Sequence, residues 1–173
     1  VPFDADVSVT ICQVMALRSA RNAGLSVPKE TIDRAIAYVK ACQNPGDGGF
    51  RYMLNPGGSA FPRSAAGVAA LYYAGVYEDK AVTDGLNYLL REGGDLANQG
   101  GGHYEYGHYY AVQAMFLAGG DYWASWFPRI REQLLSTQQP SGAWPSSYGE
   151  PYGTAMSLLI LQVPNRLLPI FQR

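Results

Sequence analysis

The sequence is poor in cysteine and in charge, and it lacks any long apolar run. Its 2 cysteines are too few for a disulfide framework and leave the redox compartment open. The net charge of −1, with 13 Lys and Arg that form no stripe, argues against a nucleic-acid-binding protein. It has no apolar stretch of about 18 residues and no signal-peptide pattern. We therefore expect a soluble protein without a transmembrane helix, in a compartment that the sequence does not specify.

Helical patterns of two kinds alternate along the chain. Segments 7–20, 64–75, 108–119 and 154–162 are apolar on nearly all sides, whereas segments 28–40, 79–90 and 121–137 combine an apolar stripe with a charged face. A helix that is apolar all round is buried, and a helix with one apolar stripe lies at the surface. The sequence of 173 residues, 47% of them hydrophobic, therefore predicts one all-α domain (1–173) with an inner and an outer layer of helices.

The loops between these segments repeat a short motif. Its fullest form is Q-x-x-x-G-x-W; QNPGDGGF (43–50) is an imperfect copy, and GGHY (101–104) is a more degenerate one. The copies define helical-hairpin repeat units of approximately 6–52, 61–104, 106–147 and 152–173. Residues that recur with a repeat are structural, the Gln capping a helix end and the aromatic ring packing between hairpins. The motif residues are Gln43, Phe50, Gln138, Gly142 and Trp144.

The alternation of inner and outer helices also predicts where function lies. Each loop that leads from an outer helix to the next inner helix lies at the same end of the molecule, which brings loops 44–62, 93–107 and 138–153 together on one rim. These loops are rich in aromatic and charged residues, and long loops on a rigid scaffold commonly carry function. The N-termini of the inner helices point to the same rim, where their partial positive charges favour an anionic ligand.

The motif and its placement resemble the prenyltransferase and squalene-cyclase repeat superfamily, in which a QW motif ends the outer helices of an α/α toroid. Tyr38 and Val39 precede Gln43 with that family's spacing, and Leu134 precedes Gln138 likewise. The resemblance implies an α/α toroid or partial toroid of helical hairpins. Three hairpins and part of a fourth are fewer than the family's closed rings. We therefore expect either a piece of a longer ring or self-association that covers the exposed inner helices.

The resemblance also implies candidate chemistry, with Asp6, Glu105 or His108 supplying an acid or a base. Because His108 opens an inner-helix pattern, we expect its side chain to face the centre of the ring. Asp6 and Thr10 match the two ends of the cyclase D-x-D-D-T motif, but Ser8 and Val9 replace its central residues. YGHYYAV (106–112) is similar to the zinc-ligating motif of protein prenyltransferases, although His108 is shifted by about one position and has no cysteine partner. His103, Glu105 and His108 lack the usual metal-ligand spacing. We therefore predict no metal or cofactor, with zinc as the alternative.

Aromatic residues on the inner helices and at the rim are candidates for ligand contacts. In the cyclases similar aromatic walls stabilise carbocations, whereas the alternative is that these rings fill the core. The candidates, with one histidine, are Tyr72, Tyr73, His103, Tyr104, Tyr109, Tyr110 and Phe116. We expect a non-catalytic repeat module that binds a ligand or partner at its aromatic rim. The alternative is a terpene cyclase or prenyltransferase that acts on an isoprenoid or other hydrophobic ligand in a central cavity.

Overall fold

The computed structural model describes residues 5–93 and 103–167. Parts of the predicted GGHY copy, of loop 93–107 and of the last repeat unit lie outside these residues. Within them the chain is all-helical, as predicted, and the only β pairing is an isolated bridge between Gln43 and Phe50. The helices are α1 (Val7–Asn22), α2 (Lys29–Ala41), α3 (Phe61–Tyr73), α4 (Lys80–Glu92), α5 (Tyr104–Ala118), α6 (Gly120–Thr137) and α7 (Glu150–Gln162), followed by the 3-10 turn η1 (Val163–Asn165).

Three helices begin about one turn earlier than the apolar pattern predicts, and the first of them is α3, which begins at Phe61 rather than at 64. α5 begins at Tyr104 rather than at 108, and α7 begins at Glu150 rather than at 154. Both first turns are polar and aromatic, so they escape a search for apolar periodicity. Pro151 and an acidic residue in each first turn are nevertheless favourable helix-start signals. Glu105 and Tyr106, which were predicted to lie in a loop, therefore lie in the first turn of α5.

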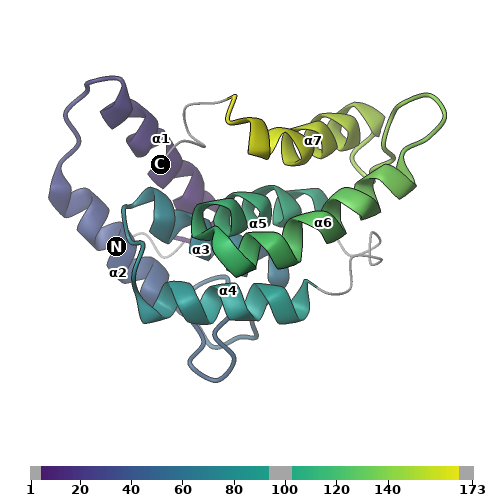
Figure 1. The fold of residues 1–173 in the computed structure, drawn as a ribbon. Helices are drawn as coiled ribbons and strands as arrows, with labels where there is room; N and C mark the ends of the chain where they lie inside the picture. The colour runs from purple at the N-terminus through teal and green to yellow at the C-terminus, as the bar shows by residue number, and fades with distance from the viewer. Residues whose placement is uncertain (1–4, 94–102, 168–173) are drawn as a thin grey trace.

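The seven helices pack in two layers that form a row (Figure 1). α3 and α5 pack against each other at the centre, α1 packs against α3, and α7 packs against α5. α2 contacts both α1 and α3, and α4 contacts both α3 and α5, as expected for an outer layer. No extensive contact joins α1 to α7 among the described residues, which therefore do not show a closed ring. In the same part of the chain, no helix is both long and apolar enough to cross a bilayer.

Burial separates the central helices from those at the ends of the row. Every residue from Ser64 to Tyr73 of α3 is buried, as the all-round apolar pattern predicts. The same prediction is wrong for α1 and α7: Val9 is 56% exposed and Leu158 is 45% exposed. The physical reason is position, because an end helix has an inner neighbour on one side only. These two helices therefore present partly apolar faces outward.

One hydrogen bond recurs between loop and inner helix. The backbone N–H of Phe50 donates to the Ser64 hydroxyl at 2.8 Å, and that of Trp144 donates to the Thr154 hydroxyl at 3.1 Å. In both cases the aromatic residue of the loop motif is bonded to a hydroxyl on the following inner helix. The amide of Gln43 donates to two carbonyls, that of Gly48 at 2.9 Å and that of Ala81 at 2.8 Å. It thereby ties its own loop to the first turn of the next outer helix.

The second glutamine of the motif acts within its own loop. The Gln138 side chain donates to the carbonyl of Gly142 at 2.9 Å, and Gly142 has a φ of 85°, a left-handed conformation that favours glycine. The indole of Trp144 is buried and donates to the carbonyl of Leu134 at 2.7 Å. This bond fastens the loop to the end of α6, so the motif shapes the path of the chain from an outer to an inner helix.

Candidate functional site

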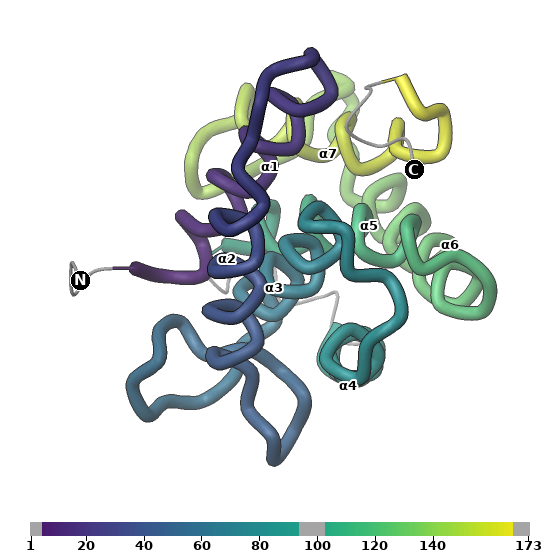
Figure 2. Tube along the Cα trace, turned by 90° about the vertical axis from the view of Figure 1, so that its left-hand side faces the viewer, coloured from purple at the N-terminus to yellow at the C-terminus, as the bar shows by residue number. Residues whose placement is uncertain are grey.

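The predicted rim contains a pocket of about 490 Å³, here called the rim pocket. Figure 2 shows the long loop between α2 and α3 projecting beyond the helices on the side where the chain enters α1. This loop and the first turns of three inner helices line the pocket, so segments far apart in sequence meet there. The lining residues are Ser8, Tyr52, Ala60, Pro62, Arg63, His103 and Tyr106.

The rim pocket has an excess of hydrogen-bond donors. Ala60 and His103 are the N-cap residues of α3 and α5, and neither side chain caps its helix. The N-terminal ends of α3 and α5, each with a partial positive charge, therefore border the pocket, although Pro62 contributes no backbone N–H. Arg63 adds a guanidinium that donates to the carbonyl of Gly58 at 2.7 Å and forms no ion pair in the described residues. Arg63 and the two helix ends therefore contribute positive charge to the pocket.

The aromatic residues of the rim pocket come from two parts of the chain, the loop before α3 and the start of α5. Tyr106 packs edge-on against Tyr110 of the same helix, with ring centroids 4.9 Å apart. Burial raises the pKa of Tyr106 to about 12, so its hydroxyl stays protonated at neutral pH. Tyr52 is 46% exposed at the mouth, and the His103 ring reaches the hydroxyl of Tyr148 in the next loop at 3.5 Å. His103, Tyr106 and Tyr148 belong to the predicted rim loops 93–107 and 138–153.

The side chain of Asp6, the first candidate acid, caps the N-terminus of α1. Its Oδ1 accepts the backbone N–H of Val9 at 2.8 Å, which makes it the N-cap of α1, and the residue is 7% exposed. A hydrogen bond with Asp6 is the largest cause that raises the pKa of Tyr52. Asp6 therefore stands beside the rim pocket, but its carboxyl oxygen is already engaged as the cap of α1.

His108, the second candidate, is enclosed by aromatic rings. Its ring centroid lies 4.4 Å from that of Tyr104, 4.9 Å from that of Phe61 and 5.8 Å from that of Trp126. It therefore lies between α3, α5 and the outer helix α6, rather than facing the centre as expected. Burial lowers its pKa to about 3, and its Nδ1 has no hydrogen-bond partner in the described residues. The imidazole is neutral at physiological pH and does not line the rim pocket.

Glu105, the third candidate, lines a separate pocket of about 210 Å³ that is also bordered by Trp144 and Ser157. The residue is 9% exposed and forms no hydrogen bond or ion pair with the described part of the chain. Its position in the first turn of α5 places the carboxylate in the favourable field of the helix N-terminus. The three candidate acid and base groups thus occupy three different places and do not form one catalytic cluster.

The aromatic candidates are also dispersed. Tyr72, Tyr73 and Tyr110 are buried, and Tyr109 lies edge-on to Tyr110 at 5.0 Å between centroids. Phe116 packs instead against Trp123 of α6. Of the predicted ligand-binding residues, only His103 lines the rim pocket, while Tyr104 lines the pocket of Glu105 and Tyr73 lines a third one. The rings therefore do not converge on a single cavity in the described residues.

Arg63 lines the rim pocket but is not among the candidate residues predicted from the sequence. It directly follows Pro62, which occupies the first turn of α3, so a helix-start signal with a cation beside it was present in the sequence. In the described residues, no group of three or more His, Cys, Asp or Glu side chains lies close enough together to hold a metal ion. Comparisons of the chain with protein-family models, with curated proteins and with solved structures found no match.

Proposed function

We propose that this chain is a non-catalytic helical-repeat module of the prenyltransferase and squalene-cyclase type that binds an anionic ligand in the rim pocket. In this proposal the two-layered row of helices is a segment of an α/α toroid. The ligand presents a phosphate-like or carboxylate group to the uncapped ends of α3 and α5 and to Arg63. An aromatic or apolar portion of the same ligand packs on Tyr52 and Tyr106.

The observation that carries the proposal is the convergence on one pocket of two helix N-termini without side-chain caps and a guanidinium that forms no ion pair in the described residues. A helix N-terminus alone is common, but here Ala60, Arg63 and His103 are brought to the same cavity by different parts of the chain. Backbone N–H groups together with an arginine form the usual donor set for phosphate and carboxylate groups. A volume of about 490 Å³ is within the range of small-molecule sites.

The condition of the candidate acids and bases supports binding over catalysis. Asp6 caps α1, and His108 is buried and neutral. A general acid or base must reach the substrate, and neither of these two side chains lines the rim pocket. The alternative of a cyclase or prenyltransferase therefore has less support than a binding module.

The test is isothermal titration of the protein with pyrophosphate at neutral pH. We expect saturable binding, and we expect Arg63→Gln to weaken it about tenfold because one charge-assisted hydrogen bond is lost. Arg131→Gln is the matched control, since Arg131 is exposed on α6 and does not line the pocket. Absence of binding at about millimolar pyrophosphate, or an equal loss in both variants, would overturn the proposal.

A further inference from the structure

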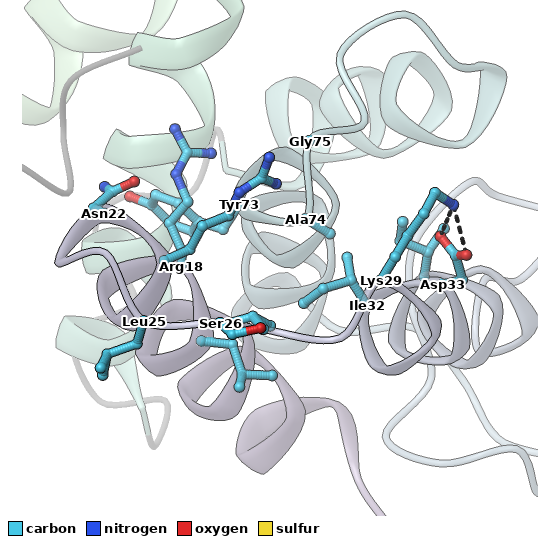
Figure 3. A pocket seen from close by; sticks show the side chains of 14 residues that line it. Arg18, Asn22, Leu25, Ser26, Lys29, Ile32, Asp33, Tyr73, Ala74 and Gly75 are labelled. Atoms are coloured by element: carbon cyan, nitrogen blue, oxygen red, sulfur yellow. Dashed lines mark hydrogen bonds and ion pairs between the residues drawn. The ribbon is translucent and has the colours of Figure 1, made fainter.

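A second and larger pocket, here called the end pocket, lies at the end of the helices opposite the rim. It has a volume of about 800 Å³ and is enclosed by the last turns of α1, the connection to α2, the first half of α2 and the C-terminal end of α3. Figure 3 shows Leu25, Ser26 and Ile32 along one edge, with Tyr73 and Ala74 behind them. Its apolar wall is formed by Leu17, Leu25, Val27, Ile32, Ile36 and Ala74.

Of the charged side chains that line the end pocket, one lysine and one aspartate form an ion pair, whereas the two arginines do not. Lys29 and Asp33 neutralise each other through an ion pair of 2.6 Å, drawn as a dashed contact in Figure 3. Arg18 and Arg21 also line the pocket, and neither forms a hydrogen bond or an ion pair with any described residue. The two arginines are three positions apart on α1, so they lie on the same helix face. The pocket therefore carries local positive charge in a chain whose net charge is −1.

Tyr73, another polar residue that lines the end pocket, already has a hydrogen-bond partner. The Tyr73 hydroxyl donates to the side-chain oxygen of Gln113, and burial raises the pKa of Tyr73. It therefore has no free proton to offer to a ligand. Arg21 is in the last turn of α1, where a cation stabilises the helix dipole. That role explains one arginine but neither the second arginine nor the apolar cavity beside them.

We infer that the end pocket binds a single-chain anionic amphiphile, with its apolar chain in the cavity and its anionic head on Arg18 and Arg21. Pockets of roughly 300–1,000 Å³ that are mainly apolar, with a few placed polar groups, are typical of small-molecule sites. The Arg pair is the polar element, and a guanidinium recognises carboxylates and phosphates with paired hydrogen bonds. Leu25, which is 64% exposed, forms part of the mouth through which a chain would enter.

The first arm of the test compares three probes of equal chain length by isothermal titration: decanoate, decyl phosphate and decanol. Decanoate or decyl phosphate, or both, should bind with one site per chain and at least tenfold more tightly than decanol. A carboxylate preference identifies a fatty-acid-like ligand, and a phosphate preference identifies a phospholipid-like one. Equal affinity for decanol, or binding only to anionic vesicles and not to the monomeric probes, would overturn the inference.

The second arm uses variants that should leave the fold intact. Arg18→Gln and Arg21→Gln should each weaken the better anionic probe about tenfold and should leave decanol unchanged. Leu25→Gln should weaken all three probes, because it alters the apolar mouth. Arg34→Gln is the control, since Arg34 pairs with Glu30 on the exposed face of α2 and does not line the pocket. Unchanged anion affinity in both Arg18 and Arg21 variants would exclude the proposed head-group site.

Discussion

Acidification should destabilise the protein through one buried imidazole, that of His108. In the folded chain, burial lowers the pKa of His108 to about 3, so the ring stays neutral. In the unfolded chain the same ring has an ordinary pKa of about 6.5 and takes up a proton below that value. The unfolded state therefore binds more protons, and stability falls as the pH decreases from about 6.5 toward 3.

The magnitude follows from the number of protons involved. One proton corresponds to about 1.4 kcal/mol per pH unit, so the free energy of unfolding should fall by about 2 kcal/mol between about pH 7 and pH 5. This window lies above the ordinary pKa values of Asp and Glu, so titration of carboxylates contributes little. The measurement is urea unfolding, followed by circular dichroism, at several pH values within the window.

The chain provides a matched control because it has 2 histidines. His108→Gln should lower stability at neutral pH but should abolish its decrease on acidification, since the replacement does not titrate. His103→Gln should retain that decrease, because His103 is exposed in the structure. The reasoning about burial is refuted if the parent protein shows no decrease between about pH 7 and pH 5, or if His108→Gln retains it.

Two further predictions concern packing and the loop motif. A Cβ added at Gly67 would lie 2.7 Å from the ring of Phe50, so Gly67→Ala should lower the free energy of unfolding by about 1–3 kcal/mol. At Gly57 no atom lies within 4 Å of the added Cβ, so Gly57→Ala should change stability by less than about 0.5 kcal/mol in the same urea assay; equal losses would contradict the packing account. Trp144→Phe should cost about 1 kcal/mol by removing the indole bond to Leu134, and unchanged urea stability would show that this bond contributes nothing.

Local periodicity accounts for the parts of the fold that the sequence predicts well. Segments 64–75 and 108–119 are apolar on nearly all sides, and they correspond to the two central helices α3 and α5. A helix surrounded by other helices has no face on which polar residues are favourable. Its sequence is therefore apolar on all sides, and this pattern predicts that it is buried. The start of α1 is similarly local, because Asp6 is a residue type that commonly caps a helix N-terminus.

The environment of a single side chain depends on neighbours that periodicity does not identify. His108 was expected to face the centre from its position on an inner helix. The structure surrounds it with Tyr104, Phe61 and Trp126, and the last two come from other helices. Its low pKa therefore results from packing between α3, α5 and α6, and no window of the sequence around His108 contains those partners.

The sequence by itself determined the helical class, the alternation of two kinds of helix and the recurring loop motif, because each of these depends on residues that are close together along the chain. Tertiary structure alone decided which inner helices lie at the ends of the row and therefore expose apolar faces. It also decided that Arg63 joins two uncapped helix ends, and that Arg18 and Arg21 border an apolar cavity. A cavity is formed by segments distant in sequence, and its shape and charge follow from how whole helices pack.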